Sequence, residues 1–192
     1  MATNKTVFFI IGILLVILGA FMLLPYVAQL IYLENSHSFL SSAFITMFIG
    51  VLFILTNLDH EFYLNLQQTF LFSVLAWVAV AIFGSIPFIF STLNLSISDA
   101  FFESMSGITT TGSTVISDLD NSPKSILLWR AIMQWLGGIG IIVMAITVLP
   151  LLKVGGMQLF KMEGSDNTEK ILPRTAEIAS IIILTYLTLT FL

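Results

Sequence analysis

The sequence is dominated by long apolar runs that are separated by short polar segments. Four runs are long enough to cross a hydrocarbon core as an α-helix, which takes about 20 mostly apolar residues; they are residues 7–33, 39–58, 70–97 and 125–152. The first three carry no charge, and the fourth carries only Arg130. A fifth run begins near Ala176 and reaches Leu192, which is too short for a full span. The pattern therefore predicts four membrane helices and the truncated start of another.

The composition agrees with a membrane location. Only 9% of the 192 residues are charged and 57% are hydrophobic, whereas soluble domains carry roughly 25% charged residues. We therefore expect an all-α integral membrane protein. The absence of cysteine excludes disulfides, thiolate metal sites and cysteine nucleophiles. A net charge of -4 without a basic cluster does not favour a nucleic-acid partner. No nucleophile is paired with a base and no glycine loop is typical of phosphate binding, so we expect neither an enzyme nor a bound cofactor.

The order of the runs divides the chain into four segments. Residues 1–69 form a predicted transmembrane hairpin, and residues 70–152 contain two helices joined by a long insert. Residues 153–175 are polar, and residues 176–192 begin the next transmembrane helix. Lysine and arginine are enriched in cytoplasmic loops, and most of them fall on one side: Lys5, Lys153, Lys161, Lys170 and Arg174. This asymmetry predicts that the N-terminus and residues 153–175 are cytoplasmic.

The insert between the third and fourth runs has the organisation of a pore loop. Its segment "SDAFFESMSGI", residues 98–108, begins with the good N-cap residues Ser98 and Asp99 and predicts a helix of about 16 Å, half the hydrocarbon thickness. The polar sequences "TTTGST" and "VISDLDNSP" then lead back to the next helix. Non-helical backbone at membrane depth is tolerated only within protein or along a watery cavity. We therefore predict a re-entrant loop between two full helices.

The threonines and glycine of this loop suit the coordination of a cation. Backbone carbonyls of an extended segment can replace the hydration shell of an ion, threonine hydroxyls add further oxygens, and glycine permits dihedral angles that aim carbonyls inward. The short helix would direct the negative end of its dipole toward the same place. "TTTG" alone is also common in surface turns, so its position after a half-length helix carries the prediction.

Two charged residues accompany the loop. Glu103 lies on the predicted half-length helix, where a buried carboxylate needs partners, so we expect it to support the loop through backbone amides or a cation. Direct coordination of the ion by Glu103 is the alternative. Arg130 is expected near the outer membrane surface, either as an anchor or as the ion-pair partner of Glu103, Asp118 or Asp120. The glycines of "WLGGIGII" serve close helix packing or form a hinge.

Three linked motifs carry a family resemblance. The sequences "FFESMSGITTTGSTV", "LLWRAIMQWLGGIGIIVMAITVLPLL" and "GGMQLFKMEGSD" resemble the Trk/Ktr/HKT superfamily of potassium transporters, and most closely its TrkH-like bacterial pore subunits. The resemblance covers essentially the whole chain. It implies a K⁺ channel-like fold, in which four helix, pore-loop, helix repeats surround one pathway after an extra helix pair. Residues 7–58 would be the extra pair and residues 70–152 the first repeat.

The resemblance also implies which residues meet the ion. Thr110, Thr111, Gly112 and Ser113 match the filter segment of the first repeat, with Gly112 holding the backbone open, and Thr109 lies at the inner edge of the motif. The transported ion would be K⁺ or, in addition, Na⁺. One such motif is found in the chain although four are needed to surround an ion. The chain would therefore supply a quarter of a pore.

Partners follow from the same resemblance. Proteins of this kind form homodimers in the inner (plasma) membrane and associate with a cytoplasmic nucleotide-binding regulatory subunit, which is TrkA-like. The lipid bilayer and these proteins are the implied partners. Two other hypotheses stay open at this point. The chain could be a secondary transporter whose discontinuous helix works by alternating access, or a non-functional truncated fragment.

Overall fold

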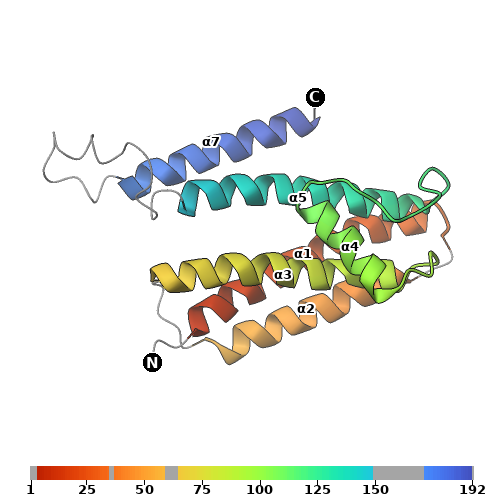
Figure 1. Ribbon diagram of the computed structural model, residues 1–192, viewed down its shortest axis with the longest axis horizontal. Helices are drawn as coiled ribbons and strands as arrows, with labels where there is room; N and C mark the ends of the chain where they lie inside the picture. Colours follow the sequence, from red (N-terminus) through yellow and green to blue (C-terminus); the bar gives the residue numbers. More distant parts are fainter. Residues whose placement is uncertain (1–3, 35–36, 59–64, 149–170, 192) are drawn as a thin grey trace, which may run out of the picture. The chain divides into compact units, whose positions relative to one another are not determined.

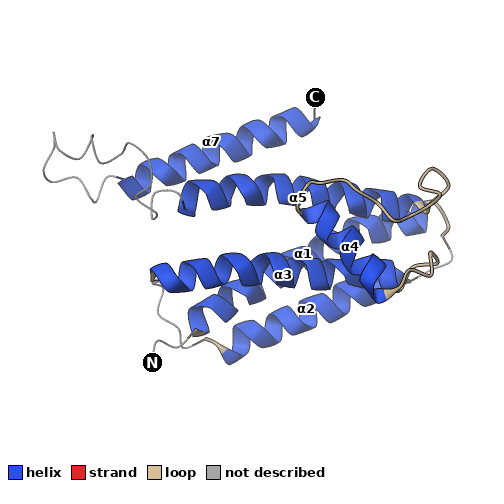
Figure 2. Ribbon diagram, viewed as in Figure 1, coloured by secondary structure: helices blue, strands red, loops and turns tan. Residues whose placement is uncertain are grey.

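The computed structural model describes residues 4–34, 37–58, 65–148 and 171–191. All regular secondary structure in these ranges is helical, as Figure 2 shows: α1 (Lys5–Ile31), α2 (Ser38–Thr56), α3 (Leu66–Ile89), α4 (Ile97–Ile108), α5 (Lys124–Val148) and α7 (Ile171–Phe191). The chain divides into two compact units, Met1–Gly137 and Gly138–Leu192. Each unit is described by itself.

Four of these helices, α1, α2, α3 and α5, are long and apolar enough to cross a membrane. Helix α4 has 12 residues and therefore reaches about 18 Å, roughly half the thickness of a hydrocarbon core. The predicted all-α integral membrane fold is confirmed: a helix hairpin is followed by a long helix, a short helix and another long helix. The protein is a multi-pass membrane protein.

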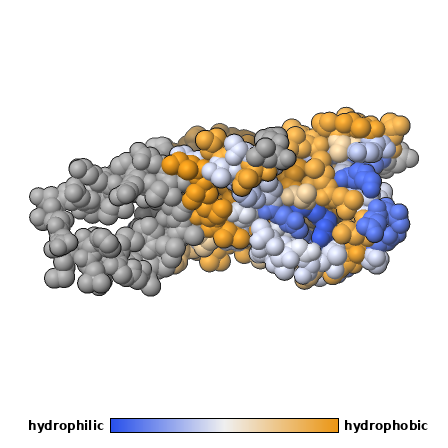
Figure 3. Space-filling model, turned by 90° about the horizontal axis from the view of Figure 1, so that it is seen from above, coloured by the Kyte–Doolittle hydropathy of each residue, from blue (hydrophilic) through white to orange (hydrophobic). Residues whose placement is uncertain are grey.

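Apolar side chains cover much of the outer surface of the first unit. Leu24 on α1 is 52% exposed and Phe44 on α2 is 71% exposed. The face in Figure 3 shows hydrophobic areas on either side of an area of hydrophilic and intermediate residues. Large exposed apolar surfaces are rare on soluble monomers and mark contact with a membrane or another protein. On helices of this length, the surface is suited to lipid.

Helices α1 and α2 pack against each other through their backbones. A Cβ atom added to Gly12 would lie 2.7 Å from the carbonyl oxygen of Gly50, and a Cβ atom on Gly50 would lie 2.8 Å from the carbonyl oxygen of Gly12. Gly19 is packed as closely, because a Cβ atom there would lie 2.6 Å from the Cγ of Met47. Small residues allow such close approach in membranes, where van der Waals packing drives helix association. The two helices thus form a tightly packed hairpin.

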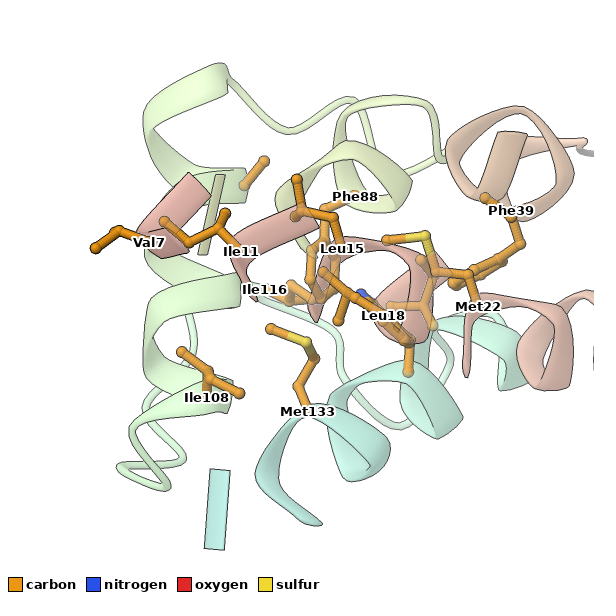
Figure 4. Close-up of a cluster of buried hydrophobic side chains, with 14 residues drawn as sticks. Val7, Ile11, Leu15, Leu18, Met22, Phe39, Phe88, Ile108, Ile116 and Met133 are labelled. Carbon is orange, nitrogen blue, oxygen red and sulfur yellow. The ribbon is translucent and has the colours of Figure 1, made fainter. Parts of the chain in front are cut away.

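A hydrophobic core joins this hairpin to the other helices of the first unit. Trp129 of α5 is fully buried in it, its indole Nε1–H donates to the carbonyl oxygen of Gly84 at 3.0 Å, and its ring lies edge-on to Phe39. A buried indole N–H usually has such a partner. Figure 4 shows the core, whose members are Val7, Ile11, Leu15, Leu18, Met22, Phe39, Ala43, Phe88, Ala100, Ile108, Ile116, Ile126, Trp129 and Met133. Trp129 therefore fixes α5 to both α2 and α3.

Helix α4 packs beside α3 at an inclined angle, as Figure 1 shows. Gly84 of α3 makes the contact possible, because a Cβ atom there would lie 2.7 Å from the Ser104 Oγ of α4 and 2.7 Å from the Met133 Cε of α5. Three helices therefore meet at one glycine, which sets the position of the short helix between the two long ones.

Helix α3 begins at Leu66, four residues before the predicted start at Phe70. Asn65 and Gln68 form a capping box, in which the Gln68 N–H donates to Asn65 at 2.8 Å and the Asn65 N–H donates to Gln68 at 3.0 Å. Capping boxes satisfy two free donors at a helix start. The apolar run by itself places the start too late because the first turn is polar.

The second unit consists of the C-terminal part of α5 together with α7. A Cβ atom on Gly138 would lie 2.6 Å from the Tyr186 hydroxyl oxygen, so the glycine lets the phenol approach α5. Helix α7 begins at Ile171, before the predicted start at Ala176, and Pro173 is tolerated in its first turn. The remainder of the predicted cytoplasmic segment, up to residue 170, lies outside the described residues.

Candidate ion-coordinating loop

The short helix α4 is capped at the end that faces away from the loop. Its N-cap is Ser96, whose Oγ accepts a hydrogen bond from the Asp99 N–H at 3.1 Å and donates one to the Asp99 carboxylate at 2.7 Å. The predicted cap at Ser98 or Asp99 was wrong by two to three residues, because Ile97 occupies the first helical position. A carboxylate in the first turn also suits the positive end of the helix dipole. The negative end then lies at Ile108, where the loop begins.

The backbone of the loop turns sharply after α4. Thr110 has φ 58° and Gly112 has φ 77°, so both adopt left-handed conformations. A β-branched residue in this region is uncommon and costs about 1–2 kcal/mol. Two hydrogen bonds hold the turn, since the N–H groups of Thr111 and Gly112 both donate to the Ser106 carbonyl oxygen, at 3.0 and 3.3 Å. The strained backbone is therefore held against the last turn of the helix.

The side chain of Ser106 adds a further link. Its hydroxyl donates to the carbonyl oxygen of Ser113 at 2.6 Å, so one buried serine holds both sides of the loop. The hydroxyls of Thr109 and Thr111 lie 2.9 Å apart, and Thr109 also donates to the Met105 carbonyl at 2.8 Å. Ser106 could not be singled out from the sequence, because a serine in a short helix has no pattern that distinguishes it from a cap or a solvent-facing residue.

Residues 110–115 are exposed in this chain, whereas residues 106–108 at the end of α4 are buried. The four residues predicted to meet the ion, Thr110, Thr111, Gly112 and Ser113, are all within this exposed stretch. The loop is thus accessible at these residues, while the carbonyl oxygens of Gly112 and Ser113 accept hydrogen bonds from Arg130 and Ser106. Carbonyl oxygens are ligands of K⁺ filters, and one segment covers only part of the surroundings of an ion. No cluster of three or more His, Asp or Glu residues that could hold another metal occurs in the described part of the chain.

Glu103 contacts the loop at Thr114 and Val115. Its side chain is buried, and its Oε1 accepts hydrogen bonds from the Val115 N–H and the Thr114 hydroxyl, both at 2.6 Å. The Thr114 hydroxyl accepts in turn from the Ile116 N–H at 3.1 Å. The carboxylate therefore replaces the backbone partners that this extended segment lacks. The Val115 N–H is a backbone amide of the kind expected for Glu103 from the sequence, and the Thr114 hydroxyl is an additional donor.

Arg130 of α5 completes the arrangement. Its guanidinium forms an ion pair with the second carboxylate oxygen of Glu103 and lies 3.5 Å from the carbonyl oxygen of Gly112. Both charged side chains are at least nine-tenths buried. Of the three partners considered from the sequence, the structure selects Glu103, while the carboxylate of Asp118 accepts instead from Asn121 at 3.1 Å. The ion pair connects α4, α5 and the loop.

Two further residues of α5 lie against the loop and α4. A Cβ atom on Gly112 would lie 3.5 Å from the Gln134 Nε2, and a Cβ atom on Gly137 would lie 1.9 Å from the Ile108 carbonyl oxygen. Gly137 therefore lets α5 touch the C-terminal end of α4. Close packing is the role that the structure shows for this glycine, one of the two roles considered for "WLGGIGII". The side chain of Gln134 was not considered from the sequence because an amide on a long helix carries no distinct signal.

The chain also matches a known protein family. The model of the TrkH family, described as a cation transport protein, matches residues 35–192. The chain belongs to the TrkH family. Its similarity to the Trk/Ktr/HKT superfamily, predicted from three motifs, is thereby confirmed at the level of the family.

Individual TrkH relatives extend over nearly the whole chain. A Trk system potassium uptake protein TrkH of Vibrio parahaemolyticus is 40% identical over 97% of this chain and 39% of its own length. The TrkH protein of Escherichia coli strain K12 is 42% identical over 94% of this chain and 38% of its own length. The crystal structure of the potassium transporter TrkH from Vibrio parahaemolyticus superimposes with a TM-score of 0.84 at 37% identity, over 98% of this chain and 38% of that chain. The chain thus spans about two fifths of the length of these relatives.

Proposed function

We propose that the chain contributes the first of four filter segments to a K⁺ uptake protein. Residues 110–113 are its ion-binding segment, and Glu103 and Arg130 support that segment. The observation that carries the proposal is the exposed loop with left-handed residues at Thr110 and Gly112, held at the negative end of a half-length helix. The TrkH relatives carry the name of potassium uptake proteins. Transport of K⁺, alone or in addition to Na⁺, requires no enzymatic step and no resident cofactor.

The proposal includes a membrane orientation and partners. The distribution of lysine and arginine favours a cytoplasmic N-terminus in the inner (plasma) membrane. The segments 1–69, 70–152, 153–175 and 176–192 then correspond to hairpin, first repeat, cytoplasmic segment and next helix. The family resemblance supports a homodimer of the complete protein and a TrkA-like nucleotide-binding regulatory subunit. A secondary transporter is disfavoured, because a threonine and glycine loop after the short helix suits a filter better than a substrate site formed by helix ends.

The test is the ion selectivity of a chimera in which residues 1–192 replace the matching part of the Vibrio parahaemolyticus relative. We expect the chimera to carry Rb⁺, a probe for K⁺, into proteoliposomes. Gly112→Ser should lower the Rb⁺ over Na⁺ flux ratio by about tenfold or more, because a residue with a Cβ atom is strained at φ 77° and shifts the carbonyls. Space does not forbid the side chain, since its Cβ atom would meet Gln134 at an ordinary 3.5 Å.

The matched control is Ser117→Ala, which alters an exposed residue just beyond the loop. It should leave the flux ratio unchanged. If Gly112→Ser folds and keeps the wild-type ratio, residues 110–113 do not form the filter. A chimera that folds and carries neither Rb⁺ nor Na⁺ would contradict the proposed transport itself.

A further inference from the structure

Helix α1 ends in an uncommon backbone conformation. Leu33 has φ 52° and is 87% exposed, so no packing of its side chain explains the left-handed geometry. The Glu34 N–H donates to the Gln29 carbonyl at 3.0 Å and the Leu33 N–H donates to the Leu30 carbonyl at 3.4 Å, which closes the helix as a Schellman motif. This motif usually places glycine where Leu33 lies. The conformation fixes the direction in which the next residue, Glu34, leaves the helix.

The carboxylate of Glu34 reaches the N-terminus of α5. Its Oε1 accepts a hydrogen bond from the Ser125 N–H at 3.2 Å, and its Oε2 accepts one from the Ser125 hydroxyl. Ser125 is fully buried and lies in the first turn of α5, where backbone N–H groups have no partner within the helix. A carboxylate at this end also suits the helix dipole. Glu34 thus acts as a helix cap supplied from 91 positions earlier in the chain.

The capped helix is the one that holds the loop. From Ser125 it continues to Arg130, which touches the carbonyl of Gly112, and to Gln134, which lies beside the same glycine. The backbone hydrogen bonds of a helix keep it rigid over this distance, since successive residues are only about 1.5 Å apart along its axis. The position of the α5 N-terminus therefore determines where both side chains meet the loop.

We propose that Glu34 is a positioning residue for the filter. Through Glu34, the extra helix pair α1–α2 sets the position of α5 along its axis relative to Gly112. The inference rests on the proposed function, since its readout is ion selectivity. It assigns the hairpin a role that goes beyond membrane anchoring: the end of α1 completes α5 and thereby holds Arg130 and Gln134 in register with the loop.

The first part of the test measures the contact without reference to transport. Thermal unfolding of the detergent-solubilised chimera is compared for wild type, Glu34→Ala, Ser125→Ala and the double variant. We expect each single variant to lower Tm and the double variant to lower it no further than Glu34→Ala alone, because Glu34→Ala removes both hydrogen bonds and Ser125→Ala removes only the one from the hydroxyl. Additive effects of the two changes would show that the contact is absent and would overturn the proposal.

The second part measures the Rb⁺ over Na⁺ flux ratio of the folded protein. Glu34→Ala and Glu34→Gln should lower the ratio, because an uncapped α5 holds Arg130 and Gln134 less firmly beside Gly112, and Glu34→Asp should restore part of it. Asp120→Asn is the matched control, because it removes one negative charge from an exposed residue of the segment that leads into α5. It should leave the ratio unchanged.

Three outcomes would overturn the positioning role. Equal effects of Glu34→Gln and Asp120→Asn would mean that only the charge of the outer surface matters. A lower yield of folded protein with an unchanged flux ratio would mean that Glu34 is merely structural. A wild-type chimera without ion flux would remove the proposed function together with the positioning role, while the unfolding cycle would still report whether Glu34 contacts Ser125.

Discussion

Glu103 and Arg130 show how two buried charges can serve a loop that has few contacts of its own. One oxygen of the carboxylate accepts from Thr114 and Val115, and the other meets the guanidinium, which also reaches Gly112. A buried ion pair is a weak source of stability by itself, because desolvation offsets the attraction between the charges. Removing one partner is costly, however, since the other charge stays buried. The main effect of the pair is therefore to fix the position of the loop, and its net contribution to stability is small.

We predict that Glu103→Gln lowers the Tm of the chimera by roughly 10 °C, because an uncompensated buried charge costs about 3–5 kcal/mol. Glutamine can still accept from the Val115 N–H, so the loss reports on the ion pair. Glu103→Gln combined with Arg130→Met should recover much of the Tm without recovering the Rb⁺ over Na⁺ ratio, since Gly112 then lacks its donor. Thermal unfolding and paired flux assays check both points. A wild-type Tm in the single variant would contradict the pairing.

At the scale of residues, the sequence predicted the kind of contact better than it predicted which residues form it. A carboxylate on a short membrane helix must have partners, and this reasoning led to Glu103 and backbone amides. Arg130 had three candidate partners, and only the fold could select among them. The contact between Glu34 and Ser125 could not be predicted, because neither residue type is unusual at its position and no local pattern links positions so far apart.

At the scale of elements, α4 and α5 meet where a side chain has no room. A Cβ atom on Gly137 would come within 1.9 Å of the Ile108 carbonyl oxygen, which belongs to the backbone and cannot rotate away. The neighbouring Gly138 differs, because a Cβ atom there would meet the hydroxyl end of Tyr186, a side chain that can move. Two adjacent glycines thus have unequal tolerance of substitution.

We predict that Gly137→Ala lowers Tm by several degrees more than Gly138→Ala, because the first change forces α5 away from α4 at a cost of about 1–3 kcal/mol. Gly138→Ala is the matched control: it makes the same chemical change one residue further along the helix. The Tm of both variants, measured by the intrinsic tryptophan fluorescence of the chimera, decides the matter. Equal Tm values would mean that α4 and α5 are not in backbone contact.

The long helices could be predicted from the sequence because an apolar run of sufficient length has few other stable structures in a membrane. Their starts could not be placed as well. The polar first turn after Asn65 extends α3 ahead of the apolar run, because its capping hydrogen bonds leave no trace in an apolar pattern. For α4, Ser96, Ser98 and Asp99 are all suitable caps by residue type, and only the structure shows that Ser96 is the one used. The left-handed Thr110 was likewise unpredictable, because threonine is disfavoured there and only the contacts with Ser106 hold it.

At the scale of the whole molecule, the open side of the loop has a direct consequence. Residues 110–115 are exposed on this chain, so an ion bound to them alone would keep much of its water. We predict that residues 1–192 expressed alone do not rescue growth on low potassium in cells that lack their own uptake systems, whereas the chimera does. Membrane fractions probed for each protein provide the control for expression. Rescue by residues 1–192 alone would show that several copies assemble around a shared pathway.

The glycine contacts between α1 and α2 also affect the order in which the helices assemble during synthesis. Because Gly12 and Gly50 touch backbone to backbone, the hairpin can assemble as soon as its second helix has entered the bilayer, before the later helices are synthesised. The carboxylate at the end of α1 is then already in place when α5 emerges from the ribosome. Glu34 is therefore available as a contact before α5 is synthesised. Helix α5, which holds the loop, is the last of these helices to enter the membrane.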